Sequence, residues 1–313
     1  MDLNVSQIQQ LTVGSVFIEQ TDGTYTFRRF TAAQKEAFGA VFPMWAVRSD
    51  YTSGIRIDFH TDADEVAVEV AAQGRYEVLV DDLSVYFETL NSGDSFRVCL
   101  EKGDHRVTIV LPCLEVGKIK RVALSGETYA KPHTYGKKVA FYGDSITQGS
   151  TAVKSSQCYT WLLTRYFDFH SVNFGVGGIR FQPETLDYMG YDPDIVIVSL
   201  GTNNYGSNRP LELLETNCPA YFERIRRIYP NSKLICITPI WRADGDVIKN
   251  AGTIHSVRAY IAQQALKYGF TVIDGFTLVP HRTEYFEDNR LHPNDLGFAL
   301  YTQNLIKALK PYL

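Results

Sequence analysis

The sequence has 313 residues, of which 45% are apolar and 21% are charged. This composition matches a folded protein that buries a sizeable core and excludes a disordered chain, and the length favours two domains. A formal charge of −4, with 31 basic and 35 acidic side chains interspersed, leaves no large basic surface for phosphates or anionic lipid, so we expect no nucleic-acid partner.

The first part of the chain, from about residue 14 to residue 124, has the period-two pattern of β-strands. Apolar and polar residues alternate there in short runs at residues 55–59, 66–70, 76–80, 96–100, 106–111 and 119–124. Turn-rich pieces such as residues 91–94 separate these runs. The sequence therefore predicts that residues 1–132 form an all-β sandwich of the jelly-roll kind.

A different pattern begins after a proline-containing connection at residues 129–133. Short apolar runs at residues 138–142, 172–174, 194–200, 233–238 and 270–273 alternate with helical segments that include residues 210–229 and 253–268. This alternation predicts that residues 133–313 form an α/β domain, in which helices cover both faces of a five-stranded parallel sheet. Ligands of such sheets bind at the carboxyl ends of the strands, so the residues that follow each strand matter most.

The first of these strands leads directly into a serine. The sequence Gly143-Asp144-Ser145-Ile146 places the Ser145 hydroxyl at the edge of the sheet, where it could act as a nucleophile. Taken alone, the serine is better explained as a cap of the helix that follows.

The next two strand ends carry groups that can donate hydrogen bonds. The second strand runs into a glycine-rich loop that ends at Gly178, where the backbone can approach a ligand closely. The third strand runs into Gly201-Thr202-Asn203-Asn204, which places a carboxamide at the same edge. A tight turn and an Asx-turn explain these two segments equally well when each is considered alone.

A histidine, His292, lies in a polar loop before the last helical stretch. A single loop histidine usually has no catalytic role. Serine, glycine, asparagine and histidine arrive here in order, each at a strand end or on the last loop of one sheet. A chance coincidence of all four is much less probable than any one of the separate structural explanations.

These four segments resemble the sequence blocks of the SGNH or GDSL hydrolase family. The resemblance covers about residues 137–311, with Gly143 to Ile146 as the first block, Asn173 to Gly178 as the second, Gly201 to Asn204 as the third and His292 to Asn294 as the last. The order of the two predicted domains is similar to that of family two carbohydrate esterases, in which a jelly-roll precedes the SGNH domain.

The resemblance implies a catalytic site without a metal or another cofactor. It implies that Ser145 is the nucleophile and His292 the general base, and that an oxyanion hole consists of the Ser145 N–H, the Gly178 N–H and the Asn203 side chain. Such a set suffices for acyl transfer, because an activated hydroxyl attacks the ester while preorganised donors stabilise the oxyanion.

A catalytic triad also needs an acid that contacts the histidine, and here the sequence departs from the family pattern, which has an aspartate three residues before the histidine. Asn289 occupies that position, and Asp288 lies four residues before His292. Either the loop bulges by one residue to deliver Asp288, which we favour, or Asn289 or a main-chain carbonyl orients the ring without supplying a charge.

Together these features predict a serine esterase that removes small acyl groups, acetyl above all, from carbohydrates. Tyr205 and Trp241 are the expected substrate-binding aromatics, although core positions are the commoner location for such residues. An acyltransferase or a lipase of the same fold is the first alternative. A glycan-binding protein whose hydrolase domain has lost its activity is the second.

The cysteines and the apolar runs bear on location. Five scattered cysteines without a metal-ligand spacing predict free buried thiols: Cys99, Cys113, Cys158, Cys218 and Cys236. The start of the sequence lacks the basic and apolar segments of a signal peptide, and no run reaches the roughly 18 apolar residues of a membrane span. We therefore expect a cytoplasmic protein with no membrane partner.

Overall fold

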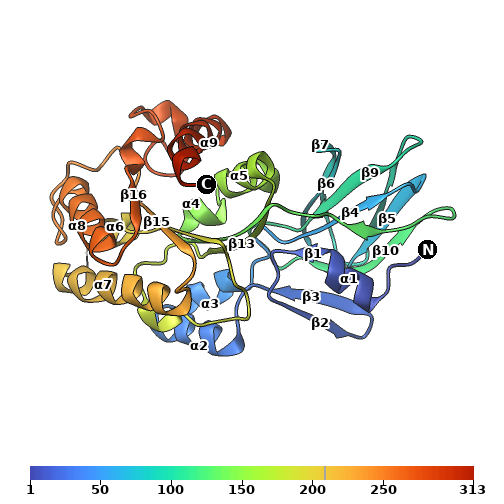
Figure 1. The fold of residues 1–313 in the computed structure, drawn as a ribbon, viewed down its shortest axis with the longest axis horizontal. Coiled ribbons are helices and arrows are strands. Elements are labelled where there is room, and N and C mark those ends of the chain that lie inside the picture. The colour runs from blue at the N-terminus through green and yellow to red at the C-terminus, as the bar shows by residue number, and fades with distance from the viewer. Residues whose placement is uncertain (208) are drawn as a thin grey trace.

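The N-terminal part of the chain forms two antiparallel sheets that enclose a common core (Figure 1). The computed structural model describes residues 1–207 and 209–313. Within that range the first sheet has the order β1 (Thr12–Val13), β4 (Arg56–Thr61), β9 (His105–Val110), β6 (Gly74–Val80) and β7 (Leu83–Leu90), with β11 (Lys131–Pro132) paired to β4. The second has the order β2 (Phe17–Thr21), β3 (Thr24–Arg28), β10 (Lys118–Leu124), β5 (Glu65–Val70) and β8 (Ser95–Cys99).

The alternation of the sequence explains why these strands pack as a sandwich. In β5, Val66, Val68 and Val70 are buried while the residues between them are partly exposed. They belong to the same core cluster as Ile57 and Phe59 of the facing sheet. The apolar sides of the two sheets therefore meet, as the predicted β-sandwich requires.

The second part of the chain contains the predicted five-stranded parallel sheet. Its order is β13 (Phe169–Gly175), β12 (Lys137–Gly143), β14 (Ile195–Ser199), β15 (Lys233–Ile237) and β16 (Thr271–Ile273), and all neighbouring pairs are parallel. The first strand of this sheet in the sequence is β12. The next strand, β13, pairs with one edge of β12, and the strand after that, β14, pairs with the other edge. The order reverses at β12, which is where ligands bind in doubly wound sheets.

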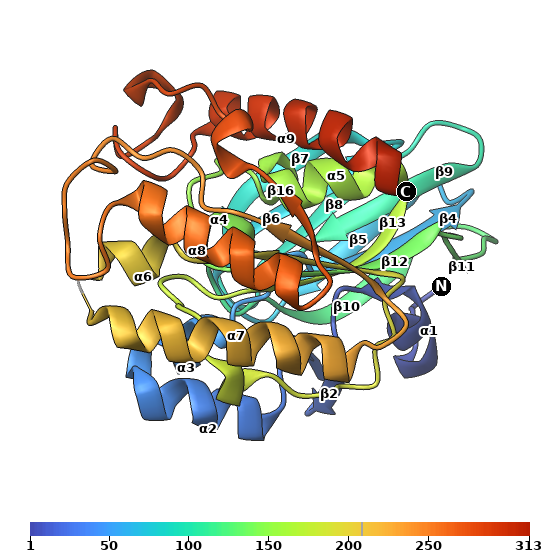
Figure 2. The ribbon, with the colours of Figure 1, turned by 60° about the vertical axis from the view of Figure 1, so that its left-hand side comes forward.

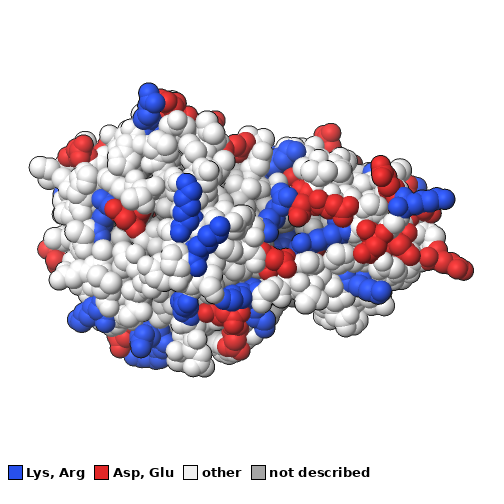
Figure 3. Space-filling model, turned by 45° about the horizontal axis from the view of Figure 1, so that its top comes forward, with Lys and Arg blue, Asp and Glu red and all other residues white. Residues whose placement is uncertain are grey.

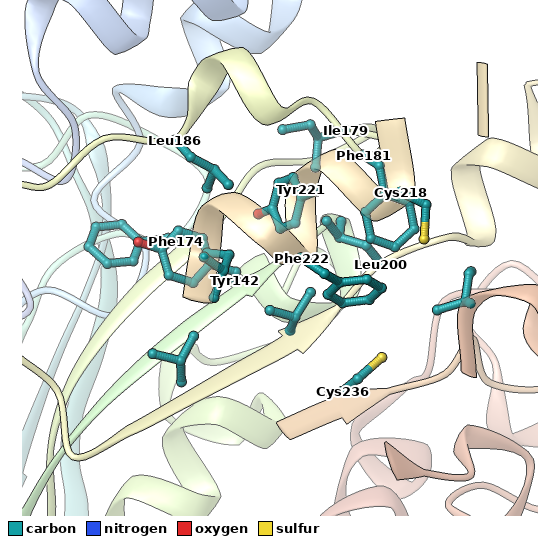
Figure 4. Close-up of a cluster of buried hydrophobic side chains, with 14 of the residues drawn as sticks. Tyr142, Phe174, Ile179, Phe181, Leu186, Leu200, Cys218, Tyr221, Phe222 and Cys236 are labelled. Carbon is teal, nitrogen blue, oxygen red and sulfur yellow. The ribbon is translucent and has the colours of Figure 1, made fainter. Parts of the chain in front are cut away.

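Helices cover both faces of this sheet (Figure 2). The side chains of α7 (Leu211–Ile228) and α8 (Ile254–Lys267) pack on one face, and those of α5 (Tyr159–Phe167) and α9 (Asp295–Leu309) pack on the other. The strands are apolar on both faces for this reason: in β14, Val196 faces the first layer and Ile197 the second. Figure 4 shows Cys218, Tyr221 and Phe222 of α7 in the first layer, together with Tyr142 and Phe174 of the sheet.

Several short helices complete the described structure. They are α1 (Val5–Leu11), α4 (Ser145–Gln148) and α6 (Thr202–Gly206), and the 3-10 turns η1 (Ser155–Gln157), η2 (Pro183–Thr185), η3 (Gly275–Thr277), η4 (Thr283–Tyr285) and η5 (Lys310–Tyr312). Both α4 and α6 follow strands of the parallel sheet directly, so their first residues lie at its carboxyl edge.

Two helices of the N-terminal part, α2 (Ala32–Val41) and α3 (Pro43–Ser49), were not expected from the period-two pattern. They lie beside α7 in both ribbon views (Figures 1 and 2). Phe38 and Trp45 belong to the same core cluster as the parallel sheet and α7. The division into residues 1–132 and 133–313 stays a prediction. Although α2 and α3 precede that boundary in the sequence, they pack into the core of the α/β part.

The surface and the cysteines agree in part with expectation. Acidic and basic side chains are interspersed on the face in Figure 3, without a large field of one sign. All five cysteines are free, but Cys99 is exposed, because its side chain lies on the outer side of the edge strand β8.

No helix among the described residues is long and apolar enough to cross a membrane.

A buried guanidinium joins the two parts of the chain. Arg29 is 1% exposed and donates hydrogen bonds to the carbonyl oxygens of Tyr51 at 2.6 Å, Asn173 at 2.8 Å, Gly175 at 2.7 Å and Arg48 at 2.9 Å. Burial lowers the pKa of this guanidinium to about 10. Carbonyl oxygens from both parts of the chain thus solvate one buried cation.

We expect Arg29→Met to lower the free energy of unfolding by about 3 kcal/mol or more. The change leaves the buried carbonyl oxygens of Asn173 and Gly175 without this donor. Each unsatisfied group costs about 1 to 3 kcal/mol. Urea unfolding would measure the loss, with Arg224→Met, at an exposed position of α7, as the matched control. Equal stability of the two variants would contradict this role of Arg29.

Candidate active site

The serine of the first block lies in a tight turn between β12 and α4. Gly143 ends the strand, and a Cβ at this position would lie 1.9 Å from the Thr147 hydroxyl oxygen, so only glycine fits there. Asp144 precedes the helix and accepts a hydrogen bond from the Ile146 N–H at 3.0 Å. The turn leaves Ser145 at the first position of α4, 9% exposed.

Ser145 and His292 are in hydrogen-bond contact, although 147 residues separate them in the sequence. The Ser145 Oγ lies 2.9 Å from the His292 Nε2, and the His292 Nδ1 lies 2.8 Å from an Asp288 carboxylate oxygen. The carboxylate accepts a hydrogen bond from the Nδ1–H, which leaves Nε2 free to accept the serine proton. The three side chains form the line of contacts that activates a hydroxyl for attack.

The loop that carries the histidine bulges at Asn289. Asn289 has a φ of +53°, and its own side chain is exposed. This conformation brings the Asp288 carboxylate within 3.1 Å of the backbone N–H groups of Arg290, Leu291 and His292. Of the two alternatives for the acid, the structure places Asp288, rather than Asn289, against the imidazole ring.

The Asp288 carboxyl is held in its ionised form. Burial opposes ionisation, but the N–H groups of Leu291 and His292 and the His292 ring outweigh that effect and lower the pKa to about 2. A negative charge beside Nδ1 stabilises the imidazolium that forms when Nε2 accepts a proton.

The predicted oxyanion donors lie on neighbouring loops. The Asn203 amide donates to the Ile179 carbonyl at 3.0 Å, so it lies beside the loop that carries Gly178. The same loop contacts the serine turn, because the Gly177 N–H donates to the Gln148 side chain at 2.8 Å. Among the described residues, neither the Ser145 N–H nor the Gly178 N–H donates to an acceptor. Both N–H groups thus stay available to a ligand.

An arginine of α3 fixes the orientation of the Gly177–Gly178 peptide. The Arg48 guanidinium donates to the Gly177 carbonyl at 2.6 Å, and the Gln148 amide donates to the Arg48 carbonyl at 3.1 Å. The carbonyl and the N–H of one trans peptide unit point in opposite directions. Because the Gly177 carbonyl points toward Arg48, the Gly178 N–H points away from it.

The sequence analysis did not predict α3 or the contact of its Arg48 with the Gly177 carbonyl. Two signals were available: Thr31 with Gln34 has the spacing of a capping box, and both bonds of the box are present. Pro43 occupies the first turn of α3, where proline is favoured. These signals predict the helices, but they do not predict that Arg48 reaches a loop 129 residues later in the chain.

Tyr205 does not lie where a substrate could touch it, which corrects the prediction of a substrate contact. Its side chain is fully buried, and its hydroxyl donates to the carbonyl oxygens of Asp244 and Val247. Lys249 lies over its ring, with 4.2 Å between the ammonium nitrogen and the ring centroid. Tyr205 is therefore a core residue that holds the loop after β15.

Trp241 lies beside the histidine loop and is half-buried. Its ring stacks on His281 with 5.8 Å between centroids and packs against Phe286 at 5.3 Å. Phe286 in turn forms a β-bridge with Pro293, the residue after His292. Trp241 thus stays a prediction as a substrate contact. No group of histidine, cysteine and carboxylate side chains among the described residues could hold a metal ion.

The parallel sheet, with a serine, a histidine and a carboxylate at its carboxyl edge, defines an α/β protein of the SGNH hydrolase class. The family model of the GDSL-like lipase/acylhydrolase family matches residues 141–300, and the chain belongs to this family. The sequence blocks in that range therefore identified the family correctly.

Solved structures with the same fold extend over both parts of the chain. Salicylyl-acyltransferase SsfX3 from a tetracycline biosynthetic pathway is 20% identical, with 96% of this chain and 94% of that chain covered and a TM-score of 0.82. A family two carbohydrate esterase from Cellvibrio japonicus is 14% identical, with 97% and 96% covered and a TM-score of 0.70. The acetyl xylan esterase Est2A from Butyrivibrio proteoclasticus is 16% identical, with 83% and 90% covered and a TM-score of 0.63. Curated protein sequences give no match.

Asp144 carries a buried carboxyl next to the serine. It is 3% exposed, and burial raises its pKa to about 6 although the Ile146 N–H, His292 and Arg242 favour the ionised form. An aspartate in an unfolded chain ionises near pH 4. Ionisation of Asp144 therefore disfavours folding increasingly between about pH 4 and pH 6, and by a constant amount above pH 6.

We expect Asp144→Asn to raise the free energy of unfolding by about 1 to 3 kcal/mol at pH 8 and by little at pH 4. The amide oxygen can still accept from the Ile146 N–H, while the buried charge is removed. Urea unfolding at several pH values would measure this, with Asp187→Asn at an exposed position as the control. A gain that does not depend on pH would contradict the assignment.

Proposed function

We propose that the protein is a serine esterase that hydrolyses small acyl esters of carbohydrates, acetyl esters in particular, through an acyl-enzyme intermediate. The observation that carries the proposal is the line of contacts from Ser145 through His292 to Asp288, at 2.9 Å and 2.8 Å. Family membership supports acyl chemistry, and these contacts supply the nucleophile, the base and the acid for it.

In the first half of the reaction, the Ser145 Oγ attacks the ester carbonyl carbon while the His292 Nε2 accepts the serine proton. Asp288 stabilises the resulting imidazolium. The N–H groups of Ser145 and Gly178, together with the Asn203 amide, donate to the oxyanion. The C–O bond to the sugar then breaks, and His292 returns the proton to the sugar oxygen, which leaves as an alcohol.

In the second half, His292 removes a proton from a water molecule, which attacks the acyl-enzyme. The bond between the Ser145 Oγ and the acyl carbon breaks, and the proton on His292 returns to the serine. The products are the free acid and the original enzyme. Apart from the substrate and this water molecule, the groups that take part in each step are side chains and backbone groups of this chain.

Two structural neighbours with the same fold support the proposal of a carbohydrate substrate. One is a family two carbohydrate esterase and the other an acetyl xylan esterase, and the likeness to the first covers the β-sandwich as well as the α/β part. We propose on this basis that an acetylated oligosaccharide is the substrate. Trp241, half-buried beside the histidine loop, is the proposed aromatic contact for a sugar ring.

Acyl transfer to an acceptor other than water is a second candidate. Salicylyl-acyltransferase SsfX3 has the same fold over 96% of this chain. The acyl-enzyme would be the same in both reactions, and the fold does not decide between them. Product analysis decides: an esterase yields free acetate in stoichiometric amounts, whereas a transferase yields an ester of the acceptor.

We expect Ser145→Ala and His292→Ala to lower the rate of acetyl ester hydrolysis by several orders of magnitude while the protein stays folded. The rates would be measured with para-nitrophenyl acetate and with acetylated oligosaccharides, using acetate release and mass spectrometry. Near-normal rates in either variant would refute the proposed roles. Faster hydrolysis of octanoyl esters than of acetyl esters would instead indicate a lipase.

The role of Asp288 can be tested against its neighbour. We expect Asp288→Asn to lower kcat by about 10⁴, as amidation of a triad aspartate does in other enzymes. Asn289→Gly is the matched control, because glycine adopts the positive φ of this position without strain and should retain most of the activity. A loss below tenfold in Asp288→Asn would indicate a Ser145–His292 dyad.

A further inference from the structure

One cavity is lined by residues that neighbour the proposed oxyanion donors in the chain, and it has no role in the mechanism above. Its volume is about 340 Å³. It is enclosed by the loop after β13, by α6, by the first turns of α7 and by the end of α2. Its lining consists of Val41, Arg180, Phe181, Gln182, Glu184, Asn204, Arg209, Pro210, Leu213, Leu214 and Asn217.

Two arginines in this lining have no carboxylate partner within ion-pair distance among the described residues. Arg180 lies over the Trp45 ring, with 4.9 Å between the guanidinium carbon and the ring centroid, and Arg209 is exposed. The single carboxylate of the lining, that of Glu184, accepts a hydrogen bond from the Gln182 amide at 2.7 Å. Two positive charges and one negative charge leave the cavity with a net positive charge.

Neutral donors add to this positive potential. Asn204 is 5% exposed, and its amide oxygen accepts from the Phe181 N–H at 3.4 Å. Its amide nitrogen has no acceptor among the described residues. The 18-residue helix α7 begins at the cavity, and its N-terminal N–H groups have no side-chain cap because the N-cap residue is Pro210. The N-terminal end of a helix favours a bound anion.

The cavity adjoins the proposed catalytic groups through short connections. Asn204 is the next residue after Asn203, on the same helix α6. Arg180 lies two residues after Gly178 and stacks on Trp45, whose indole nitrogen would lie 3.4 Å from a Cβ on Gly178. Two residues of the lining are thus close neighbours, along the chain, of two proposed oxyanion donors.

We propose that this cavity is a subsite for a carboxylate of the substrate, bound by Arg180, Arg209 and the Asn204 amide. The proposal rests on the proposed esterase function and narrows its substrate class to esters that carry a negative charge. The carboxylate belongs either to the sugar, as in an acetylated uronic acid, or to the acyl group, as in a succinyl ester. Guanidinium groups with free donors are well suited to bind carboxylates in pairs of hydrogen bonds.

The test compares charged and neutral esters of matched shape. One arm uses the acetylated methyl glycosides of glucuronic acid and glucose, and the other uses succinyl and butyryl esters of para-nitrophenol. In one arm, kcat/KM should be at least about tenfold higher for the charged ester, the size expected when hydrogen bonds to an ionised group are gained. That arm identifies which part of the substrate carries the carboxylate, and added salt should weaken the preference.

Substitutions in the lining test whether the preference for charged esters arises in this cavity. Arg180→Gln should lower the ratio of charged to neutral kcat/KM roughly tenfold, and Glu184→Gln should raise it, because the competing carboxylate is removed. Arg224→Gln, at an exposed position of α7 outside the cavity, should leave the ratio unchanged. The absence of any preference in both arms, or an unchanged ratio in Arg180→Gln, would overturn the subsite.

A binding measurement separates this proposal from the proposed function. Methyl glucuronide and monomethyl succinate should bind the wild-type protein more tightly than methyl glucoside, by nuclear magnetic resonance titration, and Arg180→Gln should remove the difference. Anion binding without hydrolysis of any ester would refute the esterase and support the subsite. Hydrolysis of neutral esters that depends on Ser145, without anion binding, would support the esterase and refute the subsite.

Discussion

The site depends on how the backbone of the glycine loop after β13 is oriented. Two arginines of the N-terminal part hold this segment by its carbonyl oxygens. Arg29 binds the end of β13 at Asn173 and Gly175, and Arg48 binds the loop that follows at Gly177. With the carbonyl groups directed toward the guanidinium groups, the intervening N–H groups have fixed directions as well. Preorganised donors need no rearrangement during a reaction. The β-sandwich part of the chain thus determines the geometry of a loop in the α/β part.

Charge is distributed unevenly around this site. The histidine side carries an ionised carboxylate, Asp288, whereas the side of the glycine loop carries Arg48 and Arg180. The acid lies beside the ring that would become an imidazolium. Arg48 lies on the carbonyl side of the Gly177–Gly178 peptide, opposite the N–H that would meet an oxyanion. The negative charge is thus near the base and the positive charge behind the donor peptide, and both signs favour the charge separation of acyl transfer.

The sequence predicted the framework of the site better than its support. Strands of the parallel sheet were evident because apolar runs such as residues 195–198 are buried on both faces. The position of Ser145 followed from the end of a strand, whereas its pairing with His292, on the last loop, was implied by the resemblance to the SGNH family. A core position for Tyr205 was the commoner alternative at the outset, but the sequence could not select it, because α6 is a single turn whose faces the sequence does not distinguish. The approach of Arg48 to Gly177 was not predictable either, since local patterns contain no information on a contact across 129 residues.

The bonds from Arg29 also constrain the order in which the chain can acquire its structure during synthesis. The acceptors of this guanidinium in β13 lie 144 and 146 residues later in the sequence. The apolar faces of α2 and α3 are likewise buried only when the parallel sheet and α7, which are synthesised later, are present. A nascent chain therefore exposes Phe38 and Trp45 until more than half of the protein has left the ribosome. Non-local contacts of this kind slow folding, and such exposed surfaces are where chaperones bind and aggregation begins.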